Sequence, residues 1–81
     1  MGIIYSRHAS QRVKLYQIDS EEIDHRLAEM DLDSLPLNEK RTFIFEGVRS
    51  KAAKPIKVVL VKERSEIVIV TIYPVKRGIQ L

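Results

Sequence analysis

A histidine and an arginine near the start of the chain have a spacing that suits chemistry on phosphate. His8 and Arg12 stand at i and i+4, so they share one face of any helix that contains them. Histidine transfers protons near neutral pH, and the forked guanidinium of arginine binds phosphate. Metal-independent RNA cleavage requires both functions, because the 2′-hydroxyl loses a proton, the leaving oxygen gains one and the phosphorane needs stabilisation. The pair therefore predicts His8 as acid or base and Arg12 as the phosphate clamp.

A structural role for the same two residues stays open. They could cap the first turns of a helix, or could pair with Glu46 or with an acid of the following helix. The other histidine, His25, falls on the outward face of an acidic helix, where a solvated side chain needs no further explanation, and we assign it no role.

Hydroxyl and basic residues in the second half of the chain are candidates for substrate binding. Thr71 and Tyr73 lie on one face of a predicted strand, where their hydroxyls could bind phosphate or base. Basic side chains can follow an RNA backbone by neutralising phosphates. The candidates for this track are Arg41, Lys54, Lys57, Lys76 and Arg77. Strand propensity explains the hydroxyl pair equally well, and solubilising charge explains the basic residues.

Several classes of protein have no support in the sequence. The chain has no cysteine, no glycine-rich phosphate loop and no zinc-protease or serine-hydrolase motif, so we expect no metal and no other cofactor. Its longest apolar run is four residues, far below the roughly 18 that span a membrane, and its start lacks the features of a secretory signal. With 81 residues, 44% of them hydrophobic, we expect one cytoplasmic domain over residues 1–81.

Two helices are predicted in the first half of the chain. Ser6 is a good N-cap for a helix of about ten residues, whose buried stripe we predict to be Ala9, Val13 and Tyr16. Asp19 or Ser20 then caps a second helix that ends near residue 31, and its predicted core residues are Ile23, Leu27 and Met30.

Three strands are predicted after the helices, over residues 41–46, 56–62 and 66–73, all rich in β-branched and aromatic residues. The last two should form a hairpin. The last strand should be central, because the residues on both of its faces are apolar. We therefore predict an α+β fold, with two N-terminal helices packed on one face of a three- to four-stranded antiparallel sheet.

The other face of this sheet provides a second functional hypothesis. Simple alternation puts Phe43, Phe45, Ile56, Val58 and Leu60 in the core. The same alternation leaves a partly apolar surface that includes Ile44, Val59 and Val61, and it assigns Thr71 and Tyr73 to the same side as Ile67 and Ile69. Such a face favours a non-enzymatic module that binds a protein or a second copy, unless the C-terminal segment covers it.

Charge is distributed unevenly along the chain. The net charge is +3 over residues 1–16, −7 over residues 17–39 and +7 over residues 40–81, which sums to the overall +3. An acidic segment between basic ones can steer an anionic partner toward one face, or can simply be a solvated helix.

Three motifs together resemble a known group of proteins. They are Tyr5-Ser6-Arg7-His8-Ala9-Ser10-Gln11-Arg12, Ile18-Asp19-Ser20-Glu21-Glu22-Ile23 and Ile69-Val70-Thr71-Ile72-Tyr73-Pro74. In order, they resemble the H-A-x-x-R, I-s-x-e-e-I and V-V-T-V-Y patterns of a widespread prokaryotic family of small domains of unknown function. That family in turn resembles the RelE and BrnT-like toxins within the barnase-EndoU-colicin-RelE group of metal-independent ribonucleases.

The resemblance implies a toxin-like endoribonuclease or a ribosome-associated mRNA interferase. It implies a site at His8, Arg12, Thr71 and Tyr73, with Tyr73 as a third catalytic residue, and an antitoxin protein as partner. Binding of nucleic acid without cleavage is a third possibility, which would show strong salt dependence but no product.

Overall fold

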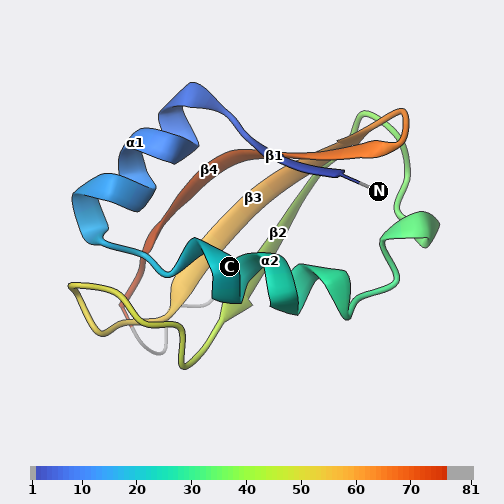
Figure 1. The fold of residues 1–81 in the computed structure, drawn as a ribbon. Helices are drawn as coiled ribbons and strands as arrows, with labels where there is room; N and C mark the ends of the chain where they lie inside the picture. Colours follow the sequence, from blue (N-terminus) through green and yellow to red (C-terminus); the bar gives the residue numbers. More distant parts are fainter. Residues whose placement is uncertain (1, 77–81) are drawn as a thin grey trace.

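The computed structural model describes residues 2–76 and has two helices, one short 3₁₀ helix and one four-stranded sheet (Figure 1). In chain order the elements are β1 (Gly2–Tyr5), α1 (Arg7–Tyr16), α2 (Ser20–Ala28), η1 (Leu32–Ser34), β2 (Lys40–Phe45), β3 (Ile56–Glu63) and β4 (Glu66–Pro74). The strand order in the sheet is β1-β4-β3-β2, so β4 is central, as predicted.

The sheet is mixed, which corrects the prediction of a purely antiparallel one. The β2–β3 and β3–β4 pairs are antiparallel, but β1 pairs with β4 in parallel, from Gly2 opposite Glu66 to Tyr5 opposite Ile69. The sequence shows only a short apolar run there, and four residues are too few for a recognisable period. The fourth strand therefore comes from the N-terminus, and the crossover from β1 to β4 contains both helices.

Local signals define the helix ends. The Ser6 hydroxyl accepts a hydrogen bond from Ala9 N at 3.0 Å, and α1 ends where Gln17 adopts a left-handed conformation with φ of 51°. Asp19 caps α2 by accepting from Glu22 N at 3.2 Å. The second helix ends at Ala28, somewhat earlier than predicted.

The core lies between the two helices and one face of the sheet. Ala9 of α1 and Ile23 and Leu27 of α2 are fully buried in one cluster with alternate residues of β3 and β4. The fully buried strand residues are Ile56, Val58, Leu60, Ile67, Ile69 and Ile72. Phe43 and Phe45, on the edge strand β2, pack against this cluster but remain half-buried. The predicted core is thus confirmed on β3 and, on the helices, at Ala9, Ile23 and Leu27, whereas the other predicted helix residues, Val13, Tyr16 and Met30, are partly buried against it.

A β-bulge changes which residues of β4 face the core. Val59 pairs with Thr71 and Leu60 pairs with Ile69, so Val70 is an extra residue without an opposite partner. Simple alternation put Thr71 on the same side as Ile69, and this prediction was wrong. Beyond the bulge Ile72 turns to the core, while Thr71 turns to the opposite face, which we call the open face.

Candidate functional site

Ser6 connects the two ends of the chain at the bulge of β4. Its backbone N–H donates to Ile69 O at 3.0 Å, and its hydroxyl donates to Val70 O at 2.8 Å. The same hydroxyl accepts the capping bond of α1, so one side chain fixes both the start of the helix and the bulge. His8 follows Ser6 by two residues, and Thr71 follows Val70 directly. The contact therefore joins the start of α1, which carries His8, to the segment of β4 that precedes Thr71.

His8 and Arg12 lie on the flank of α1 that faces away from α2. The opposite flank, with Val13 and Lys14, borders a hollow of about 230 Å³ that Tyr5 and Ser20 also line. At 100° per residue, the stripe containing His8 and Arg12 lies on the other side of the buried Ala9. His8 is exposed and Arg12 is half-buried. Within the described part of the chain, neither side chain forms a hydrogen bond or an ion pair with another side chain.

Thr71, Tyr73 and Lys57 share the open face of the sheet, which is also turned away from α2. Tyr73 is paired with Lys57 across β4 and β3, and Lys57 Nζ lies 5.5 Å from the centre of the Tyr73 ring. This contact is a cation–π interaction at a partly exposed site. Thr71 lies in the next row, opposite Val59. The three residues therefore combine hydroxyl, aromatic and cationic groups on one surface.

The remaining candidates are separated from this group or lie outside it. Arg41 pairs with Leu60 and so shares the core side of β2, where its Nη2 is 2.9 Å from Glu39 Oε2. Lys76 is exposed just beyond β4. Arg77 lies outside the described residues, as do residues 78–81, so the predicted covering of the open face by the C-terminal segment is not described either.

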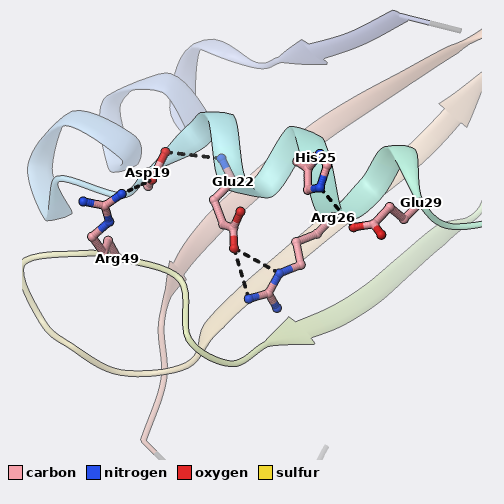
Figure 2. Close-up of polar contacts among 6 residues, drawn as sticks. All are labelled: Asp19, Glu22, His25, Arg26, Glu29 and Arg49. Atoms are coloured by element: carbon pink, nitrogen blue, oxygen red, sulfur yellow. Dashed lines mark hydrogen bonds and ion pairs between the residues drawn. The ribbon is translucent and has the colours of Figure 1, made fainter.

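Two of the acidic side chains in and beside α2 pair with basic side chains of the same helix. Figure 2 shows Arg26 beside Glu22 and His25 beside Glu29, both at i and i+4, with closest nitrogen–oxygen distances of 3.2 and 3.4 Å. Asp19 caps the helix and lies 3.8 Å from Arg49 of the β2–β3 loop. These contacts provide local partners for three of the eight acids in the −7 segment.

One tyrosine at the junction of β1 and the helices has a strongly shifted acidity. Burial raises the pKa of Tyr5, and the hydrogen bond that its hydroxyl donates to Asp24 Oδ1 at 2.8 Å raises the pKa further. The same hydroxyl is 3.2 Å from Ser20 O. Tyr5 is thus a neutral donor that ties β1 to α2, and it takes no part in the candidate site.

Residues 2–76 contain neither a metal-ligand cluster nor a membrane-spanning helix. No three histidine, cysteine or acidic side chains gather there as they would around a metal ion. Neither helix described has the length and apolar character required to cross a membrane.

Two features of the candidate site have no signature in the sequence. One is the bulge at Val70, because the run from Ile67 to Tyr73 is apolar or β-branched at both parities and gives no sign of a shift. The other is the bond from Ser6 to the Val70 carbonyl. The capping role of Ser6 was visible in the sequence, but its second partner lies 64 residues away.

Comparison with known proteins gives no relative for this arrangement: no family model, no curated protein and no solved structure matches the chain.

Proposed function

We propose that this protein cleaves RNA without a metal ion, using the exposed flank of α1 and the open face of the sheet. The observation that carries the proposal is the pair of hydrogen bonds from Ser6 to Ile69 and Val70, which joins the start of α1, where His8 lies, to the strand segment that leads to Thr71. The motifs quoted above support the same reaction.

Each residue has a chemical task in this proposal. His8 is exposed and moves the proton, while Arg12 stabilises the charge that develops on the phosphorane. Tyr73 supplies a hydroxyl or a stacking surface, and Thr71 holds the substrate beside it. Lys57 neutralises a backbone phosphate next to Tyr73. A toxin-like activity on ribosome-bound mRNA would use the same groups.

The test is incubation of the purified protein with labelled single-stranded RNA in EDTA at low salt. We expect cleavage that leaves a 2′,3′-cyclic phosphate, and a loss of at least about 100-fold in His8→Ala, in line with the usual worth of general acid–base catalysis. Translating ribosomes are added in a parallel reaction, because an interferase could require them.

The chain offers a matched control in its other histidine. His25 is exposed on α2 and its nearest acidic partner is Glu29, so His25→Ala removes the same side chain at a distance from the proposed site. The control should retain full cleavage. Equal activity in His8→Ala and the wild type, or no product with or without ribosomes, would refute the proposal.

The pattern of the open face favours a second candidate function, association with a second copy of the chain. Its rows run from acidic Glu63 and Glu66, through apolar Val61 and Val68, to basic Lys57. A two-fold axis through the middle of this face would place the acidic row of one copy opposite Lys57 of the other, and it would cover the apolar rows.

Both candidate functions use the open face of the sheet, so the oligomeric state of two variants distinguishes them. Val59→Glu adds a charge in the middle of the open face. It should convert a dimer to a monomer in sedimentation equilibrium if the second candidate is correct, while His8→Ala should leave the dimer intact. A wild-type protein that is monomeric at high concentration would remove the second candidate.

A further inference from the structure

A small hollow lies within the loop that joins β2 to β3. It has a volume of about 270 Å³, and its lining consists of Gly47, Val48, Arg49, Ser50, Ala53 and Lys54. Pockets for drug-sized ligands begin at about 300 Å³, so this hollow suits a small chemical group. Figure 1 shows the loop at the end of the sheet near the C-terminal end of α1.

The loop is fixed to the junction between the two helices. Asp19 N donates to Arg49 O at 2.9 Å, and Lys51 N donates to Tyr16 O at 2.7 Å. Val48 is only 4% exposed and belongs to the core. The walls of the hollow are therefore held in place before any ligand binds, which reduces the entropy lost on binding.

One polar atom in this loop lacks a partner. The Ser50 Oγ is buried, and within the described part of the chain it has no hydrogen bond. A buried hydroxyl without a hydrogen-bond partner costs free energy, so buried hydroxyls in native structures generally have such a partner. Ser50 lines the hollow, and a rotation about its Cα–Cβ bond, which has three staggered positions, is needed for this hydroxyl to donate to an oxygen atom there.

The two charged side chains that line the hollow itself are cationic. Arg49 and Lys54 line it, and Arg26, which is bonded to Glu22, lies beside Gly47. The acids nearby are Asp19, which caps α2 and faces Arg49 at 3.8 Å (Figure 2), and Glu46, which precedes the loop. The Arg49 side chain is 91% exposed, and such a long, solvated ion pair is weak, so an anion can recruit this guanidinium.

We propose that this loop binds a phosphate group of an RNA chain, with the Ser50 hydroxyl donating to a phosphate oxygen and with Arg49 and Lys54 neutralising its charge. That the phosphate belongs to RNA rests on the proposed function. The loop ends at Pro55, whose carbonyl accepts from Val75 N at 2.9 Å, and Lys57 follows two residues later. A strand of RNA lying against Lys57 and Tyr73 would therefore reach the loop with a neighbouring phosphate.

The test is a titration of the ¹⁵N-labelled protein, followed by the amide shifts of residues 47–54. The titrants are sodium phosphate, sodium chloride at equal ionic strength and an eight-nucleotide single-stranded RNA. We expect saturable shifts with phosphate and with RNA, but not with chloride. Ser50→Ala and Lys54→Gln should each weaken binding about two- to fivefold, in line with partly exposed charge pairs. Asp19→Asn, which keeps a good N-cap and removes a negative charge, should strengthen it by a similar factor.

A lysine of the same loop provides the matched control. Lys51 does not line the hollow, and it contributes its backbone N–H to the fold, so Lys51→Gln removes an equal charge without altering the proposed site. Binding should be unchanged in this variant. Equal weakening by Lys51→Gln and Lys54→Gln would reduce the effect to general electrostatics and overturn the proposal. Ser50→Ala should also keep or raise the melting temperature, which shows that a loss of binding is not a loss of fold.

The titration separates this inference from the proposed reaction. Loop shifts with RNA but no cleavage would refute the reaction and leave the phosphate site standing. Cleavage without any loop shift would refute the phosphate site alone. Shifts with inorganic phosphate and none with RNA would identify free phosphate as the ligand and overturn the assignment to RNA.

Discussion

The two faces of the sheet are made by the same strands but have different environments. On the face toward the helices, Leu60, Ile69 and Ile72 are fully buried, whereas on the open face Ile4 and Ile44 are 45% and 37% exposed. The strands are apolar on both sides, so hydrophobicity alone does not separate the faces. The helices do so by covering one of them, and the bulge at Val70 determines which residues of β4 lie on each.

The difference between the two faces indicates where functional side chains can lie in so small a protein. The buried face carries the hydrophobic contribution to folding and tolerates little change. The open face carries Lys57, Thr71 and Tyr73, whose polar atoms contribute less to the core and can serve binding. Substitutions on each face measure how sharp this division is.

The largest expected effect comes from truncation of two neighbouring residues on opposite faces. Leu60→Ala should lower the free energy of unfolding by about 2–5 kcal/mol because it leaves a cavity in the core. Val61→Ala, one residue along β3, should cost about 1 kcal/mol or less. Urea denaturation at two protein concentrations measures both. A Val61→Ala loss as large as that of Leu60→Ala, together with a dependence on concentration, would show that a second copy covers the open face.

A smaller effect is expected at the residue that joins the bulge to α1. Ser6→Ala removes the helix cap, at about 1 kcal/mol, and the bond to the Val70 carbonyl, at about another 1 kcal/mol. Thermal unfolding measures the loss. Ser10→Ala, an exposed serine of the same helix, is the control and should be neutral or slightly stabilising because alanine is the better helix former. Equal stabilities for the two variants would contradict the linking role of Ser6.

The smallest effect at neutral pH is expected for Tyr5→Phe, at about 1 kcal/mol for the lost hydrogen bond to Asp24. The pH dependence is more informative. Because the pKa of Tyr5 is raised in the folded protein, the unfolded chain loses its phenolic proton first as the pH passes about 10, and stability then falls with rising pH.

Denaturant titrations between pH 8 and pH 11 test this sign. The wild type should lose more stability over that interval than Tyr5→Phe does. Tyr16→Phe, which keeps Tyr5, should behave like the wild type. Parallel curves for wild type and Tyr5→Phe would show that the Tyr5 hydroxyl is not held as described.

Much of the fold could be predicted because local signals were strong. The caps at Ser6 and Asp19, the helical stripes and the β-branched strands all indicate their elements without tertiary information. The first strand was missed because its four residues pair only with a segment more than 60 residues away. Pairing at such a distance has no local signature.

The candidate site was predictable in its residue types and not in its geometry. His8 and Arg12 share a helix flank because of their spacing, which the sequence alone fixes. The prediction grouped Thr71 with Ile69 on one face, but the two lie on opposite faces because one inserted residue reverses the alternation of a strand. Arg41 was grouped with Lys57, yet its parity on β2 turns it to the other side of the sheet.

By itself, the sequence determined the α+β class, the helix starts, the buried stripes of the helices and the apolar character of β3 and β4, since each depends on propensity and period within a few residues. Only the tertiary structure decided the parallel pairing of β1, the bulge at Val70 and the contact of Ser6 with it, and the unpartnered hydroxyl of Ser50. The physical reason is that these features depend on hydrogen bonds between residues far apart in the chain, whose partners are defined only once the helices and the sheet have packed together.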